Sequence, residues 1–125
     1  MKKIITSLSI LFLLTVNVHA KLIASPEILT VKIDANNSEI IYFKVSGGGL
    51  CIKDVISKNG GESFSTAAQS DISHYKWSDK LHSGNRKYVV VDSFYLFRSD
   101  DSGISWKQTS ASTYIRKQLK SAEIS

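Results

Sequence analysis

The sequence predicts an all-β protein with two antiparallel β-meander units and a short C-terminal helix. Short segments rich in β-branched and aromatic residues alternate with turn residues along most of the chain, as antiparallel strands do. A turn motif also occurs twice, 42 residues apart, and repeats of about that period are typical of stacked β units. The chain has 125 residues, which is enough for one domain and excludes a multidomain enzyme.

The first unit is predicted to contain four strands. Most of them are apolar and β-branched, and residues of the types Asp, Asn, Ser and Gly separate them as turns. The glycines at 47–49 end the second strand, because glycine adopts positive φ at little steric cost. The four predicted strands cover residues 28–33, 39–45, 50–56 and 63–68.

The second unit is predicted to contain three strands, at residues 87–91, 94–98 and 104–108. The polar stretch 69–86 before them is predicted to be mainly loop, with room for a short strand at 73–77. After them, Ile115 and Leu119 are four residues apart, which predicts a basic amphipathic helix over 112–122 with Ser112 as its N-cap.

Residues 1–20 have the pattern of a secretory signal peptide. Two lysines precede an apolar stretch at 4–14, and small residues lead to a cut after Ala20. The alternative is a membrane anchor, but the apolar stretch is short for a bilayer core of about 30 Å. We therefore expect residues 21–125 to be one β domain, exported to the periplasm or secreted.

Residues that could carry chemistry are few. Cys51 is the only cysteine, so no internal disulfide can form, and its apolar neighbours favour a small buried side chain over a reactive thiol. His74 and His82 lack the spacing of a zinc site, and the sequence has no nucleophile elbow, phosphate loop or dinucleotide fingerprint. We therefore expect a non-enzymatic protein with no catalytic residues, metal or cofactor. Export and a mild positive charge also argue against a nucleic-acid partner.

The repeated turn motif has the form S-x-[DN]-x-G-x-S-[FW]. Its Asp or Asn can bond the turn backbone, its Gly supplies positive φ, its Ser hydroxyls can tie the loop ends, and its aromatic is expected to anchor the turn in the core. The motif residues are Ser57, Asn59, Gly61, Ser63 and Phe64 in the first copy, and Ser99, Asp101, Gly103, Ser105 and Trp106 in the second.

This motif resembles the Asp-box, or BNR repeat, of sialidases and related β-propellers. The second copy fits it throughout, whereas the first has Asn59 for the acid and Phe64 for Trp. The resemblance implies two propeller-blade-like halves, at about 28–68 and 87–108, and a structural role for the motif residues. The alternative is that the motifs form a ligand- or partner-binding rim. The chain departs from the family in copy number, because a closed propeller needs at least about four blades.

The polar segment between the halves holds the candidate binding loop. A small Ser-Gly tip can turn sharply and enter a narrow cleft, and loops on β scaffolds often carry binding. The loop loosely resembles the Ser-Gly loop with which periplasmic lysozyme inhibitors plug their enzyme, although its spacing to Tyr88 is one residue longer. The alternative is a plain surface turn. The candidate partner-binding loop is His82, Ser83, Gly84, Asn85 and Arg86.

Two functions from different classes fit these observations. The first is an inhibitor or immunity protein that blocks a cell-wall-degrading enzyme, such as a lysozyme or a secreted amidase toxin, with Tyr75 and Trp77 as further anchors. Its partner is expected to be a protein, a peptidoglycan hydrolase. The second is a small glycan-binding or envelope-surface module in which Tyr75, Trp77 and Trp106 stack on sugar rings. Exposed sheet edges also favour a homodimer.

Overall fold

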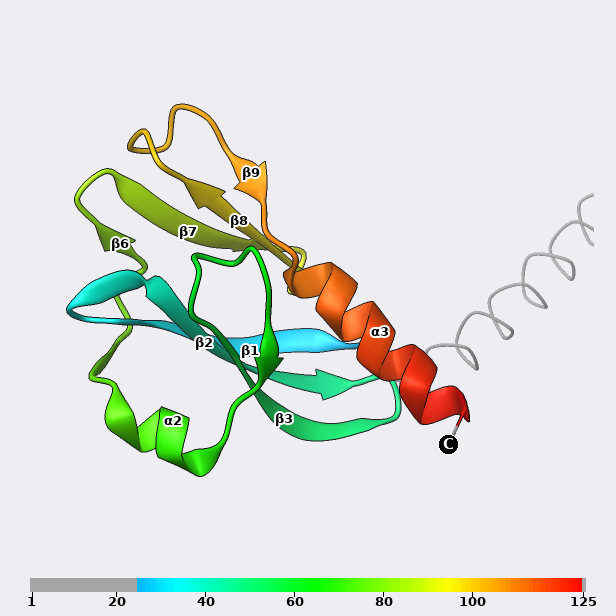
Figure 1. Ribbon diagram of the computed structural model, residues 1–125. Helices are drawn as coiled ribbons and strands as arrows, with labels where there is room; N and C mark the ends of the chain where they lie inside the picture. Colours follow the sequence, from blue (N-terminus) through cyan, green and yellow to red (C-terminus); the bar gives the residue numbers. More distant parts are fainter. Residues whose placement is uncertain (1–24, 125) are drawn as a thin grey trace, which may run out of the picture.

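The computed structural model describes residues 25–124, and it contains two antiparallel sheets and two helices (Figure 1). The predicted signal segment 1–20 lies outside the described residues, as does the side chain of Cys51. The predicted β-rich fold with a C-terminal helix is therefore confirmed for the described part of the chain. Among these residues, no helix combines the length and the apolar character needed to cross a membrane.

The first sheet has the strand order β4-β3-β2-β1-β5, and every neighbouring pair is antiparallel. Its three long strands form a meander, because the tight turns at 35–36 and 48–49 reverse the chain. The first of these turns has the residues Ala-Asn, and the second has two glycines with positive φ. The strands are β1 (Glu27–Asp34), β2 (Asn37–Gly47), β3 (Leu50–Ser57), β4 (Ser65–Thr66) and β5 (Trp77–Ser78).

The second sheet has the order β6-β7-β8-β9, again antiparallel throughout. Its central pair is β7 with β8, joined by a turn in which Asp92 and Ser93 both have positive φ. The strands are β6 (His82–Ser83), β7 (Arg86–Val91), β8 (Tyr95–Ser99) and β9 (Lys107–Gln108). The helices are α2 (Gln69–His74) and α3 (Ala111–Ile124).

Three local predictions are wrong in detail. The strands predicted at 63–68 and 104–108 are two residues long, because the turn motifs hold the residues before them in hydrogen-bonded loops. The segment 69–86 contains α2, β5 and β6 rather than mainly loop. The helix also begins earlier than predicted, because the carbonyl of Ser110 accepts the N–H of Tyr114 at 2.9 Å, which places Ser112 buried within the first turn.

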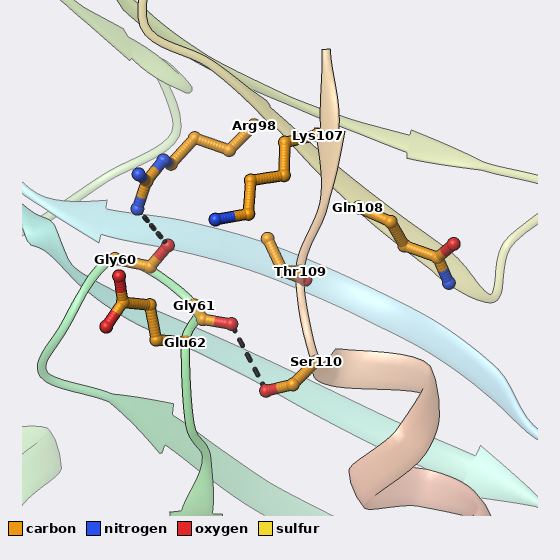
Figure 2. Close-up of a pocket in the computed structure, with 8 residues that line it drawn as sticks. All are labelled: Gly60, Gly61, Glu62, Arg98, Lys107, Gln108, Thr109 and Ser110. Carbon is orange, nitrogen blue, oxygen red and sulfur yellow. Dashed lines mark hydrogen bonds between the residues drawn. The ribbon is translucent and has the colours of Figure 1, made fainter.

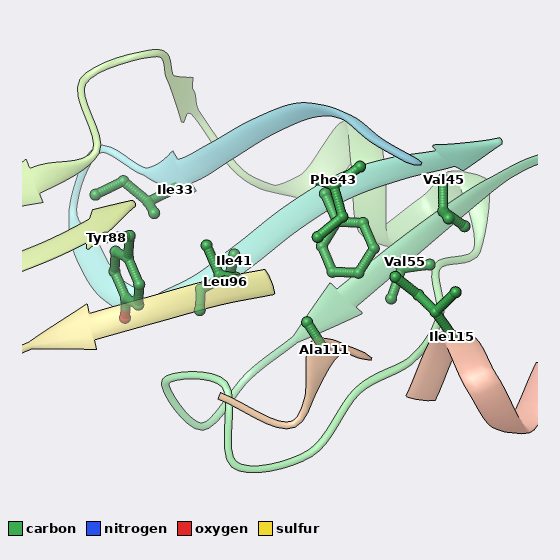
Figure 3. Close-up of a cluster of buried hydrophobic side chains, with 10 residues drawn as sticks. Ile33, Ile41, Phe43, Val45, Val55, Tyr88, Leu96, Ala111 and Ile115 are labelled. Atoms are coloured by element: carbon green, nitrogen blue, oxygen red, sulfur yellow. The ribbon is translucent and has the colours of Figure 1, made fainter. Parts of the chain in front are cut away.

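One hydrophobic core holds the two sheets and α3 together (Figure 3). It joins residues of β1, β2 and β3 to Tyr88 of β7, Leu96 of β8, and Ala111 and Ile115 of α3. A hydrogen bond at 2.5 Å from the Tyr88 hydroxyl to the carbonyl of Ser38 links the sheets at one end of this core. The sheets therefore stack face to face, and α3 packs against the same core.

The two sheets have the same orientation in the stack, so that corresponding faces of the two sheets point in the same direction. In the first sheet Phe43 and Val55 lie on one face, here called the front face, and both side chains are fully buried in the core. The strand pairings repeat at the motif offset, since Val55 pairs with Thr66 as Phe97 pairs with Gln108. The front face of the second sheet therefore bears Val89, the partner of Phe97 in β7. It points away from the core, and Val89 is 39% exposed.

Candidate functional site

The two turn motifs have the same hydrogen bonds. The Ser57 hydroxyl accepts the N–H groups of Gly61 at 2.9 Å and Asn59 at 3.3 Å, and it donates to Asn59 Oδ1. The Ser99 hydroxyl accepts the corresponding N–H groups at 2.8 and 3.3 Å and donates to Asp101. Both serines are buried, so their hydroxyls replace water as partners for the turn backbone. These bonds support the predicted structural role of the motif serines.

The acid or amide of each motif closes the loop onto the second motif serine. Asn59 Oδ1 accepts the N–H of Ser63 at 3.0 Å, and its Nδ2 donates to the Ser63 hydroxyl at 2.7 Å. Asp101 accepts the N–H of Ser105 at 2.8 Å and the Ser105 hydroxyl at 2.5 Å. The pKa of Asp101 is lowered from 3.8 to about 2, because the carboxylate accepts hydrogen bonds from the hydroxyl of Ser105, the backbone N–H of Ser105 and the hydroxyl of Ser99.

The motif aromatics differ between the copies, and the expectation of a core anchor is wrong for one of them. Phe64 packs on the core, with its ring centroid 5.4 Å from that of Phe43. Trp106 is 43% exposed, and its Nε1 donates to the carbonyl of Gly103 at 3.1 Å. The reason lies in the stacking of the sheets, because the front face is inward in the first sheet and outward in the second.

The predicted binding loop forms a small hairpin. His82 pairs with Lys87 and Ser83 with Arg86, so Gly84 and Asn85 make a two-residue turn. The φ of Gly84 is +59°, as the first central position of a tight hairpin turn requires, and an added Cβ there would meet no atom within 4 Å. Residues 82–85 are exposed, so the turn points into solvent.

Two contacts tie this hairpin to the second turn motif. The carbonyl of Asn85 accepts the N–H of Ser102 at 2.8 Å, and Asn85 Oδ1 accepts the Ser102 hydroxyl at 3.0 Å. Arg86 donates through Nε to Asp100 at 2.9 Å, and it lies 3.9 Å from Glu39. The hairpin and the motif loop therefore form one hydrogen-bonded projection, here called the tip, which consists of residues 82–86 and 100–106.

The tip and the front face of the second sheet also carry exposed apolar side chains outside the predicted binding loop. Ile104 is 86% exposed in the tip, beside Trp106. Val89 and Val91 are about as exposed as Trp106, and they line the front face between β6 and β8. The sequence does carry one signal for this surface, because β7 is apolar at consecutive positions, as a strand with two apolar faces would be.

Tyr75 and Trp77 lie elsewhere, on the outer face of the first sheet. The Trp77 ring is 5.2 Å from Tyr42 and 5.5 Å from Tyr75, and its Nε1 donates to the carbonyl of Ile72 at 2.8 Å. Both side chains are half-buried. Trp106 lies on the front face of the second sheet, on the opposite side of the molecule. The three aromatics therefore cannot stack together on one sugar chain.

A cluster of titratable groups lies beneath Trp77. The Tyr42 hydroxyl donates to Asp54, and Lys44 donates to the same carboxylate at 3.0 Å. Burial is the main cause that raises the pKa of Tyr42, and the contact with Asp54 adds to it. Tyr42 itself is buried under the Trp77 ring, so the cluster fixes the outer face of β2 and β3.

Comparisons with protein-family models, with curated proteins and with solved structures find no match for this chain. Within residues 25–124, no group of three or more His, Cys, Asp or Glu side chains is placed to hold a metal ion. Of the predicted partner-binding residues, His82–Arg86 gather in the tip, whereas Tyr75 and Trp77 lie on the other sheet.

Proposed function

We propose that this protein is an exported, non-enzymatic inhibitor or immunity protein that blocks a peptidoglycan hydrolase by inserting the tip into the enzyme's cleft. One observation carries the proposal: the exposed Gly84-Asn85 turn, which follows Ser83, is hydrogen-bonded through Asn85 to the loop of the second turn motif. A loop held in this way loses little conformational entropy when it binds, which favours affinity.

The surroundings of the tip also favour a protein partner. Ile104 and Trp106 flank the turn with exposed apolar surface, and apolar and aromatic side chains near the centre of an interface contribute most of the binding energy. In this proposal the two units are successive blade-like repeats. When repeats are related by rotation about one axis, the front face of each repeat packs against the back face of the next. The front face of the last repeat then has no neighbour, which agrees with the exposure of Val89.

The test measures hydrolysis of purified peptidoglycan by a lysozyme and by a muramoyl-peptide amidase, with the protein comprising residues 21–125 added in increasing amounts. We expect inhibition of one enzyme at stoichiometric concentration. Ser83→Trp places a bulky ring on the turn and is expected to weaken inhibition by about tenfold or more, because a closely fitting interface tolerates little added volume.

Ser65→Trp is the matched control, since Ser65 is also an exposed serine of a two-residue strand, but in the first sheet. Equal loss of inhibition in both variants would assign the effect to general destabilisation and contradict the role of the tip. Full activity of both enzymes at a large excess of the protein would contradict the proposal itself. Binding to a glycan array that Trp106→Ala abolishes would favour the glycan-binding alternative.

A further inference from the structure

A cavity of about 370 Å³ lies between the first turn motif and the second sheet (Figure 2). One wall is the motif turn with Gly60, Gly61 and Glu62, and the other is formed by Arg98 of β8 and the segment from Lys107 of β9 to the start of α3. Its volume is within the range of small-molecule sites, which is about 300–1,000 Å³. No residue of the tip lines it, so the cavity adjoins the proposed inhibitory surface without being part of it.

The cavity wall is built by two glycines at which a larger residue would be strained. Gly60 and Gly61 have φ values of +70° and +89°. A Cβ added at Gly60 would lie 2.4 Å from Nη1 of Arg98, and one added at Gly61 would lie 2.7 Å from Cγ2 of Thr109. The carbonyl of Gly61 also accepts the N–H of Ser110 at 2.9 Å and its hydroxyl at 3.1 Å. The two walls are therefore fixed relative to each other.

The guanidinium of Arg98 has hydrogen-bond partners within the protein. Its Nη1 donates to the carbonyl of Gly60 at 2.8 Å, and its Nη2 pairs with Asp100 at 3.0 Å. Its side chain is only 15% exposed. Arg98 therefore contributes structure to the cavity, since its guanidinium holds the Gly60 carbonyl and shares the Asp100 carboxylate with Arg86.

Lys107 and Glu62 are different, because neither takes part in the ion pairs formed between described residues. Figure 2 shows their side chains reaching toward Gly60 from the two walls, Lys107 from β9 and Glu62 from the motif turn. Both residues are exposed. The cavity thus presents one ammonium and one carboxylate on opposite walls, with no net charge from this pair.

We propose that this cavity binds a short zwitterionic peptide, whose terminal carboxylate contacts Lys107 and whose terminal ammonium contacts Glu62. A balanced pair of opposite charges favours a ligand that carries both charges, since each end of that ligand then contacts a group of opposite sign. Charge-assisted hydrogen bonds at both ends would fix the orientation of the peptide.

The experiment titrates ¹⁵N-labelled protein, residues 21–125, with glycylglycine and follows the amide chemical shifts. We expect saturable shifts at residues 60–62 and 107–110, with the amides of the 82–86 turn unmoved. N-acetyl-glycylglycine and glycylglycinamide each lack one charge, and each is expected to bind about tenfold more weakly. No saturable shifts with glycylglycine, or equal binding of the three probes, would overturn the proposal.

Matched variants test the two charges. Glu62→Gln and Lys107→Gln are each expected to weaken glycylglycine binding by about tenfold, because each removes one charge-assisted contact. Glu27→Gln and Lys80→Gln make the same charge changes at exposed positions outside the cavity and are expected to leave binding unchanged. Equal weakening by a variant and its control would overturn the proposal. The outcome is independent of the hydrolase assay, so either proposal can fail alone.

Discussion

Asp101 and Asn59 show how one loop geometry accepts either an acid or an amide. In both motifs this side chain accepts the backbone N–H four residues later, but its bond with the serine hydroxyl there runs in opposite directions. Asn59 donates to Ser63, whereas Asp101 accepts from Ser105. A hydroxyl can do both, which explains why the Asn in the first copy does not disrupt the turn.

This difference predicts a pH effect confined to the second motif. The pKa of Asp101 is lowered from 3.8 to about 2 by hydrogen bonds to its charged form, so the stabilisation that it gives is fully present above pH 4 and is lost as pH falls through 2. Asp101→Asn should keep the loop bonds and remove this titration. We expect the wild type to have the higher Tm at pH 6 and its advantage to shrink between pH 4 and pH 2.

Thermal denaturation followed by circular dichroism measures this effect. The pKa values of Asp54, Asp71 and Asp100 are also lowered, but these residues are common to both proteins and cancel in the difference. A Tm difference that stays constant from pH 6 to pH 2 would show that the charge of Asp101 does not stabilise the loop.

Among the elements, the long strands and α3 could be predicted from the sequence, and the small elements could not. The strands β1, β2, β3, β7 and β8 agree with the predicted segments to within two residues at each end. Helix α2 has six residues and none of them is buried, so its sequence has no apolar periodicity that would indicate a helix. Contacts with residues outside the helix hold it instead, namely Lys58 with Asp71 at 3.1 Å and Trp77 Nε1 with the carbonyl of Ile72.

These contacts predict that Trp77 stabilises the fold rather than binding a partner. Trp77→Ala should lower the free energy of unfolding by about 2–3 kcal/mol, less than full burial would give, because the half-buried ring covers Tyr42. Trp106→Ala is the matched control, and its effect should be within about 0.5 kcal/mol, because Trp106 is exposed. Urea denaturation measures both, and equal effects of the two variants would contradict this assignment.

For the whole molecule, the stacking of the sheets could not be predicted from the sequence. Both turn motifs fit one pattern, so the sequence favours the same role for Phe64 and Trp106. The difference arises from tertiary packing, which buries Phe43 and exposes Val89 at corresponding positions of the two units. The sequence indicates the turn at Gly84 by its residue types alone, but the hydrogen bonds between Asn85 and Ser102 join residues 17 positions apart, which no local pattern indicates.

The shared core predicts that both sheets unfold together. Tyr88 and Leu96 of the second sheet are buried against the first, and the N–H of Ile28 donates to the carbonyl of Ser93 at 2.6 Å across the two sheets. Neither sheet can unfold without exposing the apolar face of the other, so equilibrium unfolding should be two-state.

The two tryptophans provide one fluorescent probe in each unit. Trp106→Phe leaves Trp77 to report on the first sheet, and Trp77→Phe leaves Trp106 to report on the second. In each variant, urea unfolding measured by tryptophan fluorescence and by far-ultraviolet circular dichroism should give one midpoint, because both methods follow the same transition. Comparing the two methods within each variant removes any difference in stability between the variants. A fluorescence midpoint separated from the circular-dichroism midpoint in either variant would show that the sheets unfold independently, and that the core they share is too weak to couple them.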